Sequence, residues 1–315
     1  MRVSVVLCTH TIERYDDCRA AAESVLSQTH ENVELVLVSD GSEAVADRFE
    51  TDFGDREGVI VHCNDENVGL LESRNNGAEL ATGEVVAFID DDAVAAEDWI
   101  ERLVAGYQRD DADEDVLAVG GRMVPAWVAG KPAFLPDEFY WLVGVTHRGF
   151  GPDGDPEKAG EVRNTFGSNI SFRRDAFLEL GGFEDDIGGR TGEKNLQGGE
   201  TELCARLQRE YDSGVYYVPD ALVAHKVFDY RTDPGWLVDR AFWQGYSKRG
   251  MEVFVPESTG DESDFLGDLL FTFVPDRLRG IVRSPSVSAV LQLVFLFVLT
   301  GAVGVGYLYG RCTWG

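Results

Sequence analysis

The stretch Glu84-Val85-Val86-Ala87-Phe88-Ile89-Asp90-Asp91-Asp92 decides the fold of this chain. Its apolar part is short and rich in β-branched and aromatic residues, which is typical of a strand buried on both faces. Three aspartates follow at the carboxyl end of that strand, where open α/β sheets bind their ligands. Adjacent carboxylates repel one another unless a cation relieves the repulsion, and Mg²⁺ and Mn²⁺ prefer oxygen ligands. The stretch predicts a metal–diphosphate site, with a solvated acidic turn as the alternative.

Short apolar runs and helical stretches alternate along the first half of the chain. Strands are expected at residues 2–7, 33–38, 59–62 and 85–89, and helices at 16–28, 42–52, 70–81 and 96–108. Such alternation predicts a parallel sheet with helices on both faces. The loops at the carboxyl ends of its strands carry Thr9, Asp40 and the three aspartates. We therefore expect polar residues from three separate parts of the sequence to converge on one crevice.

The composition limits the kinds of partner. The chain has 315 residues, with 56 acidic against 28 basic side chains and a net charge of −28. Nucleic acid is excluded as a partner, because phosphate binding relies on clustered positive charge. An acidic, lysine-poor chain with an ordinary hydrophobic content is typical of a globular protein that works in high salt, where screening weakens self-repulsion. The five cysteines show no metal or disulfide spacing, which suits a reducing cytosolic setting.

The carboxyl-terminal part carries a membrane signal. Residues 284–310 contain no charged side chain, and about 20 apolar residues suffice to span a bilayer. Arg277, Arg279 and Arg283 precede this stretch, which by the positive-inside tendency keeps the main domain in the cytoplasm. The sequence predicts a single-pass protein of the cell membrane with a transmembrane helix at 284–310. An amphipathic juxtamembrane linker at 256–283 is expected to lie along the membrane surface. A buried core helix is the alternative for the apolar stretch.

Several motifs resemble those of family-2 glycosyltransferases. They are Val5-Val6-Leu7-Cys8-Thr9, Ser39-Asp40-Gly41-Ser42, Glu66-Asn67-Val68-Gly69, Arg74-Asn75-Asn76-Gly77, Phe88-Ile89-Asp90-Asp91-Asp92, Gly167-Ser168-Asn169 and Gly199-Glu200-Thr201-Glu202-Leu203. The resemblance implies a nucleotide-sugar-dependent hexosyltransferase that inverts the anomeric carbon. It also implies the A-type glycosyltransferase fold, a Rossmann-like α/β fold with a mostly parallel sheet. A glycosyltransferase domain is then expected at 1–255, with a nucleotide-sugar-binding half at 1–120 and an acceptor-side half at 121–255.

The candidate binding and metal residues lie in these motifs. The residues expected to bind the nucleotide sugar are Thr9, Asp40, Asn67, Arg74 and Asp91. Asp40 can accept hydrogen bonds from a base or ribose, or else cap the following helix. Arg74 can orient the diphosphate and the aspartates, or else form an ordinary surface ion pair. Asp92 and Asp90 are the expected ligands of a Mg²⁺ or Mn²⁺ ion, while bracing of the loop is the alternative for Asp90.

The transfer also needs a base to take the proton of the acceptor hydroxyl. The resemblance places this base in Glu200-Thr201-Glu202-Leu203. Gly199 stands where the family usually has a glutamate, which leaves Glu200 and Glu202 as candidates. We favour Glu200, because it would open the expected helix at 201–209, and we expect Glu202 to bond the start of that helix.

One histidine also stands near the expected site. His225 follows an expected strand at 221–224, within a local sequence that resembles a family element near the diphosphate. Contact with phosphate or metal and a purely structural role both remain open for it.

The expected substrates are a UDP- or GDP-linked sugar and a lipid-linked acceptor. The Gln-x-x-Arg-Trp signature of processive synthases is missing around Arg240 and Trp243, so we expect transfer of a single hexose or hexuronic acid. A domain beside a membrane suits a saccharide on polyprenyl or dolichyl phosphate. The salt-adapted chain resembles archaeal transferases that build lipid-linked glycans for protein N-glycosylation. The alternatives are transfer in exopolysaccharide or glycolipid synthesis, and a sugar-phosphate nucleotidylyltransferase, although residues 1–42 offer no lysine for the phosphate loop of the latter.

Overall fold

The computed structural model describes residues 1–109, 115–184, 189–191, 194–254 and 266–314. The chain forms two compact units, each assembled from three separate segments. Unit 1 comprises residues 1–124, 157–189 and 199–225, and unit 2 comprises residues 125–156, 190–198 and 226–315. The domain boundaries expected from the sequence, at residues 120, 255 and 283, stay predictions.

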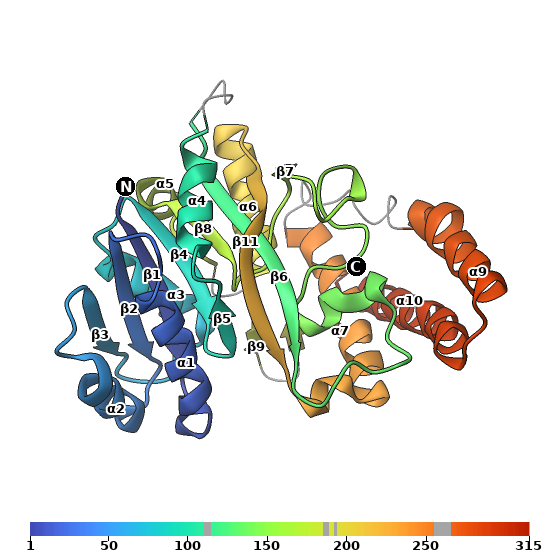
Figure 1. Cartoon of the computed structure of the whole chain (residues 1–315), viewed down its shortest axis with the longest axis horizontal. Helices are drawn as coiled ribbons and strands as arrows, with labels where there is room; N and C mark the ends of the chain where they lie inside the picture. Colours follow the sequence, from blue (N-terminus) through green and yellow to red (C-terminus); the bar gives the residue numbers. More distant parts are fainter. Residues whose placement is uncertain (110–114, 185–188, 192–193, 255–265, 315) are drawn as a thin grey trace. The chain divides into compact units, whose positions relative to one another are not determined.

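A mixed β-sheet forms the centre of unit 1 (Figure 1). Its parallel part runs in the order β3 (Val59–Cys63), β2 (Val33–Ser39), β1 (Val3–Thr9) and β4 (Val85–Asp90). The order continues through β8 (Ile170–Arg173), β6 (Ala118–Trp127), β11 (Val215–Val227) and β5 (Ala93–Ala95), and β7 (Gly160–Val162) pairs with β11. The pairs β4–β8, β8–β6, β11–β5 and β11–β7 are antiparallel. The four strands expected at the amino-terminal end are thus confirmed as a parallel set, and antiparallel strands extend them.

Helices cover both faces of this sheet. They are α1 (Tyr15–Leu26), α2 (Glu43–Phe53), α3 (Leu70–Leu80), α4 (Trp99–Tyr107), α5 (Arg174–Glu179) and α6 (Gly199–Tyr211), with the 3₁₀ turn η1 (Ile12–Arg14) before α1. Side chains of α3, α5 and α6 share one buried cluster with every second residue of β1, β2 and β4. Figure 1 shows α1 and α4 on the opposite face. The four helices expected from the sequence are confirmed as α1 to α4, with ends shifted by a few residues.

Close packing fixes α3 against the parallel strands. A Cβ atom at Gly77 of α3 would collide with the side chain of Val6 on β1 and lie 3.2 Å from that of Val38 on β2. The glycine therefore lets the helix approach the sheet backbone. Because Arg74 lies one turn earlier on α3, this approach also sets the position of its side chain relative to the ends of the strands.

Unit 2 contains the long carboxyl-terminal helices. Its elements are η2 (Asp137–Val143), η3 (Pro152–Gly154), β10 (Lys194–Leu196), η4 (Asp229–Thr232), α7 (Pro234–Phe254), η6 (Leu269–Phe273), α9 (Val274–Arg283) and α10 (Val287–Trp314), and β10 pairs with β9 (Gly189–Thr191). With 28 residues and a strongly apolar composition, α10 is long and apolar enough to cross a membrane. The helix expected at 284–310 is therefore present. Of the linker expected at 256–283, residues 256–265 lie outside the described part of the chain.

Candidate active site

Strand pairing in unit 1 brings the candidate residues to one edge of the sheet. β1 and β4 are parallel neighbours, with Cys8 opposite Asp90. Their carboxyl ends therefore lie side by side, and the hydroxyl of Thr9 donates to Oδ2 of Asp91 at 2.6 Å. Beyond the aspartates, β5 pairs with β11 so that Ala93 lies opposite His225. This register places a histidine from late in the chain beside the aspartate loop.

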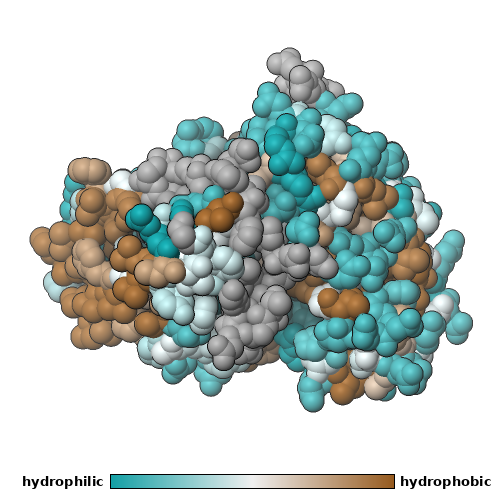
Figure 2. All heavy atoms as spheres, turned by 180° about the vertical axis from the view of Figure 1, so that it is seen from behind, coloured by the Kyte–Doolittle hydropathy of each residue, from teal (hydrophilic) through white to brown (hydrophobic). Residues whose placement is uncertain are grey.

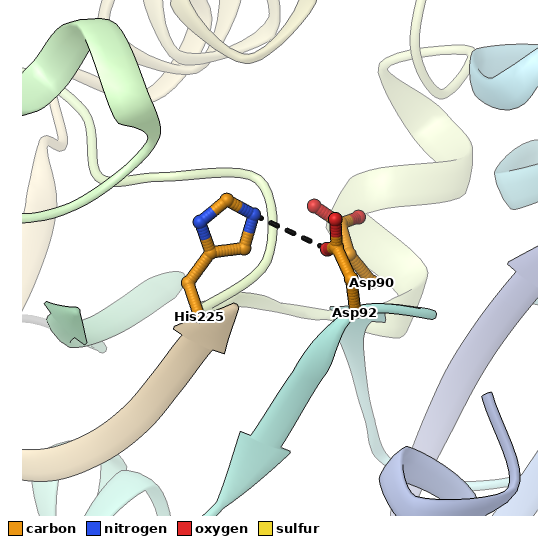
Figure 3. A group of neighbouring side chains, drawn as sticks. All are labelled: Asp90, Asp92 and His225. Atoms are coloured by element: carbon orange, nitrogen blue, oxygen red, sulfur yellow. Dashed lines mark ion pairs between the residues drawn. The ribbon is translucent and has the colours of Figure 1, made fainter. Parts of the chain in front are cut away.

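Asp90, Asp92 and His225 form a cluster that can hold a metal ion. Figure 3 shows the two carboxylates and the imidazole turned toward one another from the ends of two strands. One ligand atom from each residue lies within 4.8 Å of the others, and Nε2 of His225 is 3.2 Å from Oδ1 of Asp92. Asp92 and His225 are buried, whereas Asp90 is half-buried. Two carboxylates suit Mg²⁺ or Mn²⁺, and an added imidazole suits a first-row transition metal, so the donor set fits a divalent cation.

Arg14 is a part of the site that the sequence did not single out. Its Nη2 lies 3.1 Å from Oδ1 of Asp91, and its Nη1 lies 3.2 Å from Oδ2 of Asp92. Burial raises the pKa of Asp91, while the bond from Thr9 and the charge of Arg14 act to lower it. The sequence could have pointed to Arg14 by its position after β1, because the segment after β1 meets the aspartates at the same edge of the sheet.

Arg74 joins the aspartate loop to the expected base. It donates from Nη2 to Oδ1 of Asp90 at 2.7 Å and from Nη1 to Oε1 of Glu200 at 3.1 Å. Its side chain is only 2 % exposed, so the alternative of a surface ion pair is wrong. Burial acts to lower the pKa of Arg74, but the charges of Asp90 and Glu200 outweigh it and raise that pKa. The guanidinium therefore stays charged and holds two carboxylates at fixed positions.

The two candidate bases have different surroundings. Glu200, at the start of α6, keeps a side chain that is 27 % exposed while it pairs with Arg74. Glu202 is buried, and both of its carboxylate oxygens accept from Arg206 at 2.6 Å. Arg206 also donates to the carbonyl oxygens of Leu180 and Gly182. Glu202 thus pairs with a residue one turn further along α6, and not with the start of the helix as was expected from the sequence. Through Arg206, it links α6 to the turn after α5.

The motif Gly167-Ser168 contacts both Asp90 and the ion pair between Arg74 and Glu200. The hydroxyl of Ser168 accepts from the backbone amide of Asp90 at 2.9 Å, which fixes the end of β4. A Cβ atom at Gly167 would collide with the carboxylate of Glu200 and lie 2.8 Å from Nη1 of Arg74. A side chain at this position would therefore displace the ends of the ion pair between Arg74 and Glu200.

Asp40 follows β2 and bonds the turn before α3, and Asn67 lies in that turn. The carboxylate of Asp40 accepts from the backbone amides of Val68 at 2.8 Å and Gly69 at 3.0 Å, and from Nδ2 of Asn64 at 3.1 Å. Asp40 therefore does not cap α2, which was the alternative expected from the sequence. It bonds the turn that precedes α3. Asn67 is exposed at the same turn. The binding roles of both residues stay predictions.

Cys8 lies next to the site but does not add a nucleophile to it. It is buried beside Asp90, and burial raises the pKa of its thiol far above the ordinary value. A neutral, buried thiol behaves as a small apolar side chain. The reactive groups described at this site are therefore carboxylates, arginines and the imidazole of His225.

Comparison with known proteins identifies the class of enzyme. Residues 4–181 match the family described as glycosyl transferase family 2. The chain is 52% identical over 313 residues to the glucosyl-dolichyl phosphate glucuronosyltransferase of Haloferax volcanii. The aligned residues cover 99% of this chain and 97% of that protein. The matched residues include the aspartate loop, Arg74 and the Gly167-Ser168 motif.

Solved structures share the fold. One is the mannosyltransferase PcManGT from Pyrobaculum calidifontis in complex with GDP-Man and Mn²⁺, with a TM-score of 0.59 at 18% identity over 98% of this chain and 88% of that chain. Another is TarS 1-349 of S. aureus in complex with UDP-GlcNAc, with a TM-score of 0.54 at 14% identity over 96% and 82%. These findings set aside the nucleotidylyltransferase alternative. The chain is a glycosyltransferase of the A-type fold and belongs to glycosyl transferase family 2.

Proposed function

We propose that this enzyme transfers a single glucuronic acid from a nucleoside diphosphate sugar to glucose carried on dolichyl phosphate. The observation that carries the proposal is the 52% identity, over 99% of the chain, to a Haloferax protein named for that activity. The similarity extends beyond the donor half to the acceptor side. It favours a hexuronic acid over a neutral hexose as the transferred sugar. We further propose that the product serves in protein N-glycosylation, as the salt-adapted composition and the lipid-linked acceptor suggest.

Glu200 is the proposed base. It takes the proton of the acceptor hydroxyl as the oxygen attacks the anomeric carbon, and nucleoside diphosphate leaves from the opposite side with inversion. Partial exposure lets an acceptor reach the carboxylate, and the bond from Arg74 holds it in place. Glu202 is less suited to the role, because Arg206 occupies both of its oxygens.

The donor is proposed to bind along the edge formed by β1, β2 and β4. Asp90, Asp92 and His225 would hold a Mg²⁺ or Mn²⁺ ion, which, when bound, offsets the negative charge that develops on the leaving diphosphate. Arg74 orients Asp90 beside Glu200. Asp91, held by Thr9 and Arg14, is proposed to face the ribose. The complexes of the structural neighbours with GDP-Man and with UDP-GlcNAc support either UDP or GDP as the carrier.

The site of action is proposed to be the cytoplasmic face of the cell membrane. A dolichyl-linked acceptor is confined to the bilayer, and α10 gives the enzyme an apolar anchor of its own. The net charge of −28 suits a cytoplasm rich in salt, where self-repulsion is screened.

The proposal is tested with purified full-length enzyme in high salt. Glucuronic acid, glucose and mannose are offered as their UDP and GDP derivatives, together with glucosyl-dolichyl phosphate, mannosyl-dolichyl phosphate or free dolichyl phosphate. Mass spectrometry should show a single glucuronic acid added to glucosyl-dolichyl phosphate. The Glu200→Gln variant provides the blank. Preferred transfer of a neutral hexose, preferred use of free dolichyl phosphate, or products extended by several sugars would each contradict the proposal.

A further inference from the structure

The apolar helix α10 has two different faces. Its exposed large apolar side chains repeat every three or four residues and form one stripe along the helix: Val287, Val290, Leu291, Val294, Phe297, Val298, Val305 and Leu308. The opposite face, which includes the buried Leu296, Leu299, Gly306 and Gly310, packs against other parts of unit 2. An apolar helix is thus covered by protein along one side and bare along the other.

The covered face is held near both ends of the helix. At the start, the carbonyl oxygen of Ala133 accepts from the hydroxyl of Ser288 at 2.7 Å. Near the end, the hydroxyl of Tyr307 donates to Glu252 of α7 at 2.8 Å. Ser288 and Tyr307 lie about 28 Å apart along a helix that rises 1.5 Å per residue, which is close to the hydrocarbon thickness of a bilayer, about 30 Å. Unit 2 therefore follows α10 over a whole membrane thickness.

The helix that covers the second half of α10 carries charged side chains that make its entry into hydrocarbon costly. The two helices lie backbone to backbone: a Cβ atom at Gly245 of α7 would collide with the carbonyl of Val303, and one at Gly306 with the carbonyl of Phe242. At this contact α7 carries an ion pair between Arg249 and Glu252, at 2.8 Å. Charged side chains on a membrane-embedded surface are expensive. If α10 crossed the bilayer with this packing intact, α7 and its charges would have to enter it as well.

Charge also favours a membrane surface beside this part of unit 2. Residues 266–314 carry two acidic side chains and four arginines, in a chain with a net charge of −28. Among the arginines, Arg279 and Arg283 of α9 are exposed, next to the exposed apolar Leu278 and Val282. Figure 2 shows hydrophobic side chains gathered over the region of α9 and α10, whereas hydrophilic ones dominate elsewhere on that face. Basic groups beside apolar ones are typical of helices that lie in the interface of an anionic leaflet.

We propose that α10 is an in-plane membrane anchor that does not cross the bilayer. Its exposed stripe sinks into one leaflet, α9 lies beside it with its arginines at the lipid phosphates, and the covered face stays on α7 and on the segment around Ala133. The partner is thus the surface of a bilayer with anionic headgroups. Both ends of α10 then lie on the same side of the membrane as the active site, unlike the crossing helix expected from the sequence.

The native Cys312 tests this topology. It is exposed near the end of α10, whereas Cys8, Cys18 and Cys204 are buried. The experiment uses a variant with Cys63→Ser, in sealed membrane vesicles of right-side-out and of inside-out orientation. A membrane-impermeant maleimide is added to each kind of vesicle, and labelling after addition of detergent gives the total amount of reactive thiol. A Glu57→Cys variant that also carries Cys63→Ser and Cys312→Ser marks the side of unit 1, because Glu57 is exposed. We expect Cys312 and the marker at position 57 to be labelled in the same vesicles.

Labelling of the two positions from opposite sides would overturn the proposal and show that α10 crosses. A Thr313→Cys variant that also carries Cys63→Ser and Cys312→Ser repeats the measurement one residue further on. The result then does not depend on how fast the thiol of Cys312 reacts. Binding of the full chain to vesicles gives a second measurement. Arg279→Gln with Arg283→Gln should weaken binding to anionic phosphoglycerol vesicles by on the order of tenfold at low salt, and should hardly change binding to zwitterionic phosphocholine vesicles. A soluble dimer that ignores vesicles would instead assign the stripe to a second copy of the chain.

Discussion

Arg74 and Glu200 lie 126 residues apart in the sequence and form an ion pair in unit 1, with Nη1 of the arginine 3.1 Å from Oε1 of the glutamate. The same guanidinium bonds Asp90 at 2.7 Å, so that it links the aspartate loop to the proposed base. A planar, always charged group with several donors can hold two carboxylates at once, whereas a lysine ammonium holds such a geometry poorly. The relative position of Asp90 and Glu200 therefore depends on Arg74.

Replacing Arg74 should damage both activity and folding. Arg74→Lys keeps the charge but loses the fixed bridge, and we expect transfer to fall by on the order of 10²-fold because misplaced groups react slowly. Arg74→Met also leaves two carboxylates without their partner and should lower the free energy of unfolding by roughly 3 kcal/mol. Transfer assays and denaturant unfolding measure the two effects. Arg48→Lys, at an exposed ion pair with Asp52, is the control and should change neither quantity. Full activity of Arg74→Lys would remove the bridge from the mechanism.

The two glutamates of α6 should respond differently to the same substitution. Glu200→Gln keeps the size of the side chain but cannot accept a proton, so transfer should fall by about 10²–10⁴-fold. Its affinity for nucleotide sugar should hardly change, because the diphosphate is proposed to bind at the aspartates. Glu202→Gln weakens the pair with Arg206 and should mainly lower thermal stability. An inactive Glu202→Gln beside an active Glu200→Gln would move the base two residues along the helix.

Metal dependence should reside in Asp92 and His225. Asp92→Asn removes a charged ligand, and we expect loss of transfer together with loss of tight Mn²⁺ or Mg²⁺ binding. His225→Ala should keep some activity but require at least roughly tenfold more metal for half-maximal rate, in line with the usual cost of weakening a metal site. Metal titrations of activity and calorimetry of metal binding separate the two variants. Undiminished transfer by wild-type enzyme in excess EDTA would contradict a metal-dependent reaction.

Arg14 should compete with a cation for the aspartate loop. Its guanidinium pairs with both Asp91 and Asp92, so Arg14→Ala leaves their repulsion less compensated when no metal is bound. We expect the variant to melt at a lower temperature than wild type without metal, and to gain more stability than wild type on addition of Mn²⁺. Thermal melts across a metal series measure both differences. Equal gains in the two proteins would show that Arg14 and the metal act independently.

The packing of α3 should tolerate little at Gly77. A methyl group there would meet the side chains of Val6 and Val38, and overpacking of this kind typically costs about 1–3 kcal/mol. Gly77→Ala should lower the free energy of unfolding by that amount and also reduce transfer, because Arg74 shifts with the helix. Glu79→Ala, at an exposed position of α3, provides the control and should leave both nearly unchanged. A more stable Gly77→Ala protein would show that α3 can move away from the sheet without cost.

Local patterns in the sequence were enough to predict the parallel part of the sheet and the helices that flank it. The β-branched runs and the helical stretches between them gave the four parallel strands and α1 to α4 with small errors at their ends. The reason is physical: period and β-propensity are properties of neighbouring residues, and parallel strands necessarily bring their carboxyl ends to one edge. The convergence of Thr9 and Asp91 follows from this and is confirmed by their hydrogen bond. The antiparallel extension through β8, β6, β11 and β5 could not be predicted in this way, since strand pairing over long distances leaves little trace in local sequence.

The sequence by itself therefore determined the family, the parallel strands and the acidic loop, because these depend on residue types and on short-range order. Only the tertiary structure decided which distant partners complete the site. The register of β5 with β11 brings His225 to Asp92. The burial of Arg74 excludes the alternative of a surface ion pair and joins its guanidinium to Asp90 and Glu200. It also separated the two faces of α10. Hydropathy sums the apolar character of a helix, but only packing shows which side of the helix protein covers and which side is left for lipid.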